Sequence, residues 1–239
     1  MCGIVGYVSS RSSIPVDRIQ AMCNALVHRG PDGSGLVAWD ETLCACDGHS
    51  DARIGLGHRR LSIIDLSEAG AQPMSNEDGS LWITYNGEFY NFQDFRSELE
   101  CQGHVFRSHC DTETILHLYE EVGLEKALAN MNGMFAFGLW NSKKQELILA
   151  RDRLGKKPLY YAHLPDGSLL FASEIKALLA SGKIDRTRLD FTALDQFWTF
   201  GFPLAPRTIY QQIKQVEAAH CLVWKQGRIE VREYWDCPI

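Results

Sequence analysis

Short apolar segments of strand length, separated by turn residues, limit the folds open to this chain more than any other feature. Hairpin-type turns join several of these segments, as at residues 141–144 and 165–167. The pattern therefore predicts sheets built largely from antiparallel neighbours. The expected strands cover residues 3–8, 35–39, 53–58, 61–65, 81–85, 133–140, 146–151, 159–163 and 169–172, with a last hairpin around Gln226 and Gly227.

Helical periodicity occurs in separate stretches of the chain. Pro15 can open a helix, and apolar residues follow at helical spacing: Val16, Ile19, Met22, Cys23 and Leu26. Further helices are expected at residues 92–102, 173–181 and 191–200, and another begins near Asp111, which is a plausible N-cap. Strands and helices in separate groups predict an α+β layered fold rather than a repeated βαβ unit.

Composition excludes several classes of partner. The 239 residues carry a net charge of −6, and the 24 Lys and Arg residues are scattered, whereas a nucleic-acid site needs a basic stripe. The apolar run from Ile4 to Val8 is far too short for a membrane span or a secretory signal. We therefore expect no nucleic-acid partner, no membrane partner and a cytoplasmic location.

The eight cysteines do not suggest a metal centre. No Cys-x-x-Cys pair occurs, and the densest group is Cys44, Cys46, Asp47 and His49 in one short loop. Thiolates one residue apart suit a tetrahedral zinc site poorly, because such sites usually take ligands from two separated pairs. This loop is therefore interpreted as polar structure, and no metal site is predicted.

The position of Cys2 near the start of the chain could make its thiol a reactive nucleophile. Removal of Met1 would place a free α-amine beside its thiol, and an α-amine titrates near pH 8, so it can act as a base. The nucleophile and its base would then belong to one residue. A lone cysteine is by itself more often an ordinary residue. However, the strand expected directly after Cys2 would hold the terminus in place.

Three other features permit two readings each. Asn86 and Gly87 offer donors for an oxyanion, but a hairpin turn is the better reading of Asn-Gly by sequence alone. Either Arg59 or Arg60 could grip a carboxylate through two parallel hydrogen bonds, or both could form a solvated edge. Asp111 could bind an ammonium group or merely cap its helix.

Together these features resemble a known family, the class II glutamine amidotransferases, which are N-terminal nucleophile hydrolases. The resemblance implies a four-layer αββα sandwich and no cofactor. It rests on motifs in the family's order: MCGIVG (1–6), HRGPDGSG (28–35), RLSIID (60–65), QP (72–73), YNGEFYN (85–91), CDTE (110–113), GMFAF (133–137), RDRLGKKPLYY (151–161) and FASE (171–174). Residues 29–32 and 60–64 are most similar to the asparagine synthetase branch.

The resemblance also implies a role for each site residue, with L-glutamine as the substrate. Cys2 would attack the glutamine amide with its own α-amine as the base, while Asn86 and the Gly87 N–H would form the oxyanion hole. The implied substrate-binding residues are Arg60 for the α-carboxylate, Glu88 and Asp111 for the α-ammonium group, and the backbone of Leu61, Ile63 and Ile64. His28, His58 and the 151–161 motif are interpreted as structural.

The expected division of the chain is a glutaminase domain at 1–182 and a C-terminal annex and linker at 183–239. In asparagine synthetase-like proteins the ammonia passes to an ATP-dependent domain with a Ser-Gly-Gly-x-Asp-Ser loop, which these residues lack. ATP and Mg²⁺ are thus implied only for that missing synthetase domain, a partner with aspartate as the default acceptor. Another carboxylate acceptor, a non-catalytic interaction module of the same fold and a homodimer all stay open.

Overall fold

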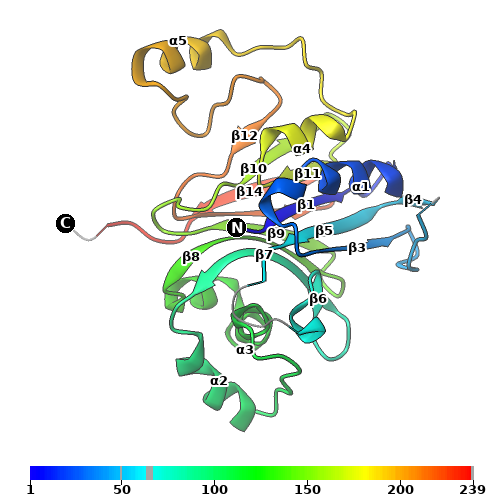
Figure 1. Ribbon diagram of the computed structural model, residues 1–239, viewed down its shortest axis with the longest axis vertical. Helices are drawn as coiled ribbons and strands as arrows, with labels where there is room; N and C mark the ends of the chain where they lie inside the picture. The colour runs from blue at the N-terminus through cyan, green and yellow to red at the C-terminus, as the bar shows by residue number, and fades with distance from the viewer. Residues whose placement is uncertain (49, 63–66, 238–239) are drawn as a thin grey trace.

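Two six-stranded antiparallel sheets form the centre of the molecule (Figure 1). The computed structural model describes residues 1–48, 50–62 and 67–237. The first sheet has the order β12 (Lys214–Gln215), β10 (Tyr160–His163), β11 (Leu169–Ala172), β1 (Gly3–Val8), β5 (Ile54–Arg60) and β3 (Gly33–Trp39). The second has the order β14 (Arg228–Glu233), β13 (His220–Lys225), β9 (Glu146–Arg151), β8 (Gly133–Asn141), β7 (Leu81–Phe89) and β6 (Met74–Ser75).

Helices cover the outer face of each sheet, which confirms the predicted αββα sandwich. Helices α1 (Val16–Asn24) and α4 (Ile175–Ala180) pack on the first sheet, while α2 (Phe92–Cys101) and α3 (Asp111–Asn130) pack on the second (Figure 1). Three buried apolar clusters correspond to the three interfaces between these four layers. The short pair β2 (Ile14–Pro15) and β4 (Asp51–Ala52) forms a separate ribbon.

Strand β1 lies at the heart of the first sheet. It pairs with β11 on one side and β5 on the other, and all six of its residues are buried. Glycines bring the two sheets together behind it. A Cβ atom added at Gly6 or at Gly138 would collide with the ring of Phe171, so this ring fills the space that the two glycines leave. Cys2 is thus attached directly to a fully buried strand that is paired on both sides.

The sequence predicted most elements within a few residues. The stripe on α1 is buried as expected, and α5 (Phe191–Phe200) has the predicted bounds. One predicted strand, residues 61–65, is wrong over its described part: β5 ends at Arg60, and Leu61 and Ser62 are irregular. The Ser62 N–H donates to Asp32 Oδ2 at 2.9 Å, which directs the backbone away from a strand ladder. The remainder of that prediction lies outside the described residues.

Two further expectations are corrected. Asn86 and Gly87 are not a hairpin turn, because β7 continues through them to Phe89 in register with β8. Asp111 is not the N-cap of its helix. Cys110 occupies that position, and the Asp111 carboxylate instead accepts hydrogen bonds from β7.

The region from residue 183 onward contributes to both sheets. Strand β12 pairs with β10, and β13 pairs with β9. Helix α5 stands away from the layers at the end of a long loop (Figure 1). The division at residue 182 stays a prediction. Among the helices in the described part of the chain, none is long and apolar enough to cross a membrane.

Candidate active site

A cavity of about 190 Å³ opens where the start of β1, the ends of β5 and β7, and the start of α3 meet. Pockets for drug-sized ligands are larger, so this volume suits a molecule of amino-acid size. The structure brings together every described residue that the sequence predicted for the site. The lining includes Cys2, Arg60, Leu61, Asn86, Gly87, Glu88 and Asp111. Ile63 and Ile64 lie outside the described residues.

The Cys2 thiol lies against the irregular backbone that follows β5. The Leu61 N–H donates to Cys2 Sγ at 3.4 Å, and the thiol faces the Leu61 carbonyl oxygen at 3.6 Å. Burial raises the pKa of the Cys2 thiol, while the Leu61 N–H and nearby positive charges oppose that rise. A neutral thiol in this position needs a neighbouring base before it can act as a nucleophile.

The turn after α1 holds the beginning of the chain. Arg29 donates from Nε to the Cys2 carbonyl oxygen at 2.9 Å and from Nη1 to Glu174 Oε1 at 2.9 Å. Gly30 lets this turn lie directly against β5, because a Cβ atom there would collide with the backbone of Arg59. The HRGPDGSG motif therefore acts as a clamp on Cys2, whereas sequence reasoning recognised it only as a family signature.

Asn86 and Gly87 face an open edge of the second sheet. Strand β6 pairs with Trp82 and Ile83, and beyond them no described strand borders β7 on that side. The Tyr85 and Phe89 N–H groups donate to side chains at this edge, at 2.7 and 2.8 Å. By strand alternation the Gly87 N–H points the same way. Asn86 Nδ2 is buried and has no hydrogen-bond partner among the described residues.

Gly87 is also required by packing. An added Cβ atom would collide with the Met134 carbonyl oxygen on the neighbouring strand β8. The Asn-Gly dipeptide therefore marks a position that requires glycine, but the turn that it suggested is not formed. Glycine serves here to let two strands approach while leaving its N–H on the cavity side.

Asp111 joins the start of α3 to the end of β7. Its Oδ2 atom accepts from the Tyr85 hydroxyl at 3.1 Å and from the Phe89 N–H at 2.8 Å. Burial raises the pKa of Asp111, and these two hydrogen bonds counteract part of that rise. A buried carboxylate of this kind favours a cationic partner, since charge pairing offsets desolvation.

The two neighbouring arginines point to different places. Arg59 donates to the Cys23 carbonyl oxygen at 3.2 Å and to the side chain of Asn24, so it ties β5 to α1. Arg60 lines the cavity and donates from Nη1 to the Ser67 carbonyl oxygen at 2.9 Å. Successive side chains of a strand face opposite sides, which explains the separation.

Several lining residues were not foreseen. Lys157 is buried, and its Nζ atom donates to Met1 Sδ at 3.3 Å. Burial lowers the pKa of Lys157, although the Glu88 carboxylate opposes this. Lys157 lies in the 151–161 motif, whose other residues form a folded loop: Asp152 accepts from the backbone N–H groups of Lys156 and Lys157, both at 2.9 Å. The other lining residues that were not predicted for the site are Met1, Ser62, Gly70, Gln72, Tyr85, Cys110, Thr112 and Met134.

The two histidines interpreted as structural do not line this cavity. His58 on β5 is buried between the two sheets, where its Nδ1 atom lies 3.1 Å from the hydroxyl of Thr84 on β7. Burial lowers the pKa of His58 to about 3, with a contribution from Arg60, so it stays neutral at physiological pH. His28 is paired with Glu174 at 2.9 Å on the outer side of the clamp.

The cavity thus combines four kinds of group. Its lining contains the thiol of Cys2, uncharged N–H donors from β7, an arginine, and the acidic groups of Glu88 and the buried Asp111. A thiol beside preorganised N–H donors can carry out acyl transfer. Opposite charges on the walls suit a ligand that has both a carboxylate and an ammonium group.

Known proteins resemble this chain over nearly its whole length. Residues 1–235 match the family model of the glutamine amidotransferase domain. The chain is 37% identical over 99% of its length to "Asparagine synthetase [glutamine-hydrolyzing] 3" and 39% identical over 98% to "Asparagine synthetase [glutamine-hydrolyzing] 1", both from Bacillus subtilis (strain 168). It spans only 37% and 35% of those two relatives.

A solved structure shows the same fold. Glutamine phosphoribosylpyrophosphate amidotransferase from B. subtilis superposes with a TM-score of 0.72 at 23% sequence identity. The match covers 98% of this chain and 49% of that one. The two chains therefore share the layered sandwich fold.

Proposed function

Because the chain belongs to the glutamine amidotransferase domain family, we propose that it hydrolyses L-glutamine to glutamate and ammonia through Cys2. The proposal rests on the cavity at the end of β7, where a thiol, N–H donors and groups of both charges converge. One observation carries it furthest: the Nδ2 donor of Asn86 is buried in that cavity wall without a partner in the described structure. A buried donor is costly unless a ligand accepts from it.

The first chemical step is attack on the glutamine side-chain amide. Once Met1 has been removed, the Cys2 α-amine takes the thiol proton, and Cys2 Sγ bonds to the amide carbon. The carbonyl oxygen becomes an oxyanion, which accepts from Asn86 Nδ2 and the Gly87 N–H. The protonated α-amine of Cys2 then gives its proton to the leaving nitrogen, so ammonia departs and a thioester between Cys2 and the glutamyl group remains. Water attacks the thioester, which releases glutamate and restores the thiol.

Substrate selection follows from the charged walls. Arg60 holds the glutamine α-carboxylate, since a guanidinium can form two parallel hydrogen bonds with it. Asp111 and Glu88 hold the glutamine α-ammonium group, while the Leu61 backbone lines the pocket. A simple amide lacks both charged ends and would leave these groups unpaired, so glutamine is preferred.

The test is a glutaminase assay on purified chain without Met1, in the absence of ATP and metal. We expect glutamate and ammonia in equal amounts and no asparagine, because the chain lacks the pyrophosphate loop. Asn86→Ala should lower kcat by about 100- to 1000-fold, the usual effect of removing one oxyanion donor. Asn132→Ala is the matched control, since its side chain is exposed. Equal activity in both variants would refute the oxyanion role.

We further propose that the ammonia serves an ATP-dependent amidation in a fused synthetase domain. The chain spans just over a third of two relatives whose names denote glutamine-hydrolysing asparagine synthesis, and this length difference supports a second domain. Large aromatic side chains on and after α5 support a partner surface: Phe191, Trp198, Phe200 and Phe202 are 77%, 83%, 56% and 59% exposed. Aspartate is the proposed acceptor.

Two alternatives have distinct outcomes. An acceptor other than aspartate would leave glutamine hydrolysis intact but change the product made by the longer protein. A non-catalytic interaction module would give no glutamine hydrolysis even from processed protein. The assembled cavity, which Cys2, Asn86 and Asp111 all line, favours the catalytic alternative.

A further inference from the structure

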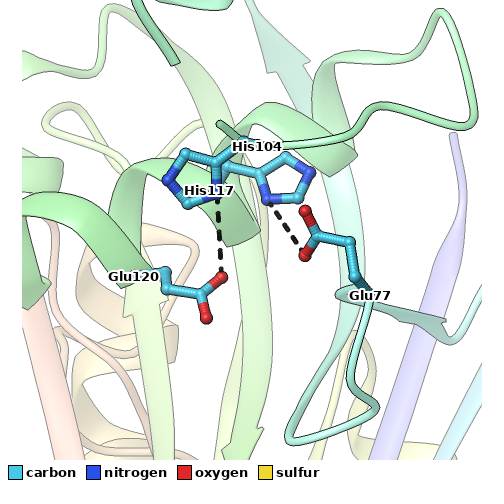
Figure 2. Close-up of side chains that lie close together, drawn as sticks. All are labelled: Glu77, His104, His117 and Glu120. Carbon is cyan, nitrogen blue, oxygen red and sulfur yellow. Dashed lines mark ion pairs between the residues drawn. The ribbon is translucent and has the colours of Figure 1, made fainter. Parts of the chain in front are cut away.

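A second group of polar side chains lies further along α3, beyond Asp111 and Thr112, which line the cavity. Glu77 comes from the loop between β6 and β7, His104 from the loop between α2 and α3, and His117 and Glu120 from α3 itself. Their ligand atoms all lie within 4.8 Å of one another. Figure 2 shows the two imidazole rings side by side, with His117 paired to Glu77 and His104 to Glu120.

His117 is anomalous for an ordinary packed histidine. Its exposed fraction is 0%, yet neither ring nitrogen has a hydrogen-bond partner within the described structure. The nearest acceptors are carboxylates beyond hydrogen-bond distance: Nδ1 lies 3.7 Å from Glu77 Oε2, and Nε2 lies 4.0 Å from Glu113 Oε1. Buried imidazoles normally satisfy at least one nitrogen, so a ligand that accepts the lone pair of Nδ1 would remove the anomaly.

Both rings have the surroundings of metal-bound histidines. In each, Nδ1 faces a carboxylate of the group, at 3.7 Å for His117 and 4.0 Å for His104. In each, Nε2 faces a further carboxylate, Glu113 at 4.0 Å and Glu121 at 3.4 Å. A metal-bound histidine usually donates its second N–H to a carboxylate or a carbonyl, which fixes the tautomer and raises ligand basicity.

We propose that Glu77, His104, His117 and Glu120 bind one divalent transition-metal ion of the Zn²⁺ type. Two imidazoles and two carboxylates are ligands that Zn²⁺ accepts in tetrahedral geometry. Bond lengths near 2.1 Å would place the ligand atoms about 3.4 Å apart, so the group must contract slightly. The side chains of Glu77, His104 and Glu120 are 32%, 12% and 33% exposed, which leaves them room to turn and gives the ion a path from solvent.

The ion would join three segments that are separate in sequence. His117 and Glu120 are three residues apart and lie on one face of α3, while Glu77 and His104 come from loops on either side. The second loop continues through residues 105–110 into Asp111 at the start of α3. Such a site would stabilise the loop that leads into Asp111 in the glutamine pocket, and it would take no part in the reaction.

Sequence reasoning missed this group because its ligands come from three segments. Only His117-x-x-Glu120 is visible as a local pattern, and a single pair on a helix is commonplace. The loop that was weighed instead holds Cys44 and Cys46, which have free thiols and can themselves bind Zn²⁺. An experiment on the proposed site must therefore separate imidazole and carboxylate ligands from thiolates.

Co²⁺ titration of the purified chain provides that separation, with Zn²⁺ used in competition. We expect one Co²⁺ per chain in a tetrahedral site whose visible spectrum lacks a sulfur-to-cobalt charge-transfer band, and displacement by Zn²⁺. The double variant His104→Gln/Glu120→Gln should weaken Co²⁺ binding at least about 10-fold. Both side chains are partly exposed, so folding should persist. His117→Gln, which changes a buried residue, is avoided.

The matched control is His163→Gln/Glu125→Gln, which removes the same two residue types at exposed positions outside the group. It should bind Co²⁺ as the unaltered chain does. Unfolding by heat supplies a second readout: Zn²⁺ should raise the Tm of the unaltered chain and the control, but not of the His104/Glu120 variant. Absence of stoichiometric binding, a thiolate band, or equal affinity in both double variants would overturn the proposal.

Discussion

Arg29 binds the carbonyl oxygen of Cys2 through its Nε atom at 2.9 Å, and its Nη1 atom binds Glu174 at the same distance. One guanidinium thus links the start of the chain to the segment that follows β11. The Ser173 hydroxyl completes the link by accepting from the Ile4 N–H at 3.0 Å. The proposed nucleophile is thus held by side chains that do not line the cavity.

Arg29→Lys should therefore impair turnover rather than substrate binding. A lysine ammonium cannot reproduce the two directed bonds to Cys2 and Glu174. A small displacement of the thiol would reduce kcat by about 10- to 100-fold, with KM changed only a few-fold. Steady-state kinetics with glutamine measures both constants. A raised KM at unchanged kcat would show that Arg29 acts on the substrate instead.

The neighbouring arginines of β5 provide a paired test of substrate binding. Arg60→Lys should lower kcat/KM for glutamine by about 10- to 100-fold, because a lysine loses the bidentate grip on the α-carboxylate. Arg59→Lys should leave kcat/KM nearly unchanged, because Arg59 binds Cys23 and Asn24 on the opposite side of the strand. If the Arg59 variant loses more activity than the Arg60 variant, the assignment is reversed.

Retention of Met1 should silence the enzyme even though the thiol is intact. A peptide nitrogen has no available lone pair, and Met1 itself lines the cavity. Protein produced with methionine aminopeptidase inhibited can be compared with processed protein by intact mass after reaction with a glutamine-like electrophile. Processed protein should gain one adduct at Cys2. Met1-retaining protein and processed Cys2→Ala should gain none there.

Cys2→Ser extends the same experiment. The variant should fold but turn over far more slowly, because a serine hydroxyl is a much weaker nucleophile at neutral pH. Efficient glutamine hydrolysis by protein whose mass includes Met1 would contradict the self-activated cysteine. The nucleophile would then have to be sought elsewhere in the chain.

The clamp on Cys2 should give the fold a distinct pH dependence. Burial alone would raise the pKa of Glu174, but hydrogen bonds from Arg29, His28 and Lys176 lower it to about 2 from an ordinary 4.5. A carboxylate whose folded pKa is depressed stabilises the fold above its unfolded pKa. That stabilisation is lost as the pH falls from 4.5 towards 2.

Glu174→Gln should accordingly reduce the free energy of unfolding by about 1–2 kcal/mol at pH 7, a value reduced for partial exposure of the ion pairs. The difference between the two proteins should shrink progressively below pH 4.5. Urea unfolding at several pH values measures it. A difference that is constant across this range would mean that the Glu174 charge is not the stabilising feature.

The sequence was sufficient to predict those elements whose buried face or strand partner can be read from the spacing of their own residues. The buried stripe of α1 and the hairpin strands β8 and β9 follow from spacing and turn residues alone. The strand predicted at 61–65 failed because Leu61 and Ser62 are held by Cys2 and Asp32, which are distant in sequence. Contacts between residues so distant in sequence produce no regular spacing of apolar residues from which they could be predicted.

The site shows the same limit. Family motifs indicated Cys2, Asn86 and Gly87, although Asn-Gly by itself favoured a turn. Nothing local indicated Lys157, because its approach to Met1 depends on the folded loop around Asp152. The Glu77, His104, His117 and Glu120 group was invisible for the same reason: only the packing of two loops against α3 assembles it.

The position of β1 has a consequence for the order of events during synthesis. Ile4 bonds to Ser173, 169 residues later, so the central strand of the first sheet lacks one neighbour until most of the chain has been made. At about 5–20 residues per second this interval lasts on the order of ten seconds or more. The nascent terminus is then an accessible extended peptide. Trimming by a ribosome-associated aminopeptidase can precede closure of the sheet, so maturation requires no later opening of the finished sandwich.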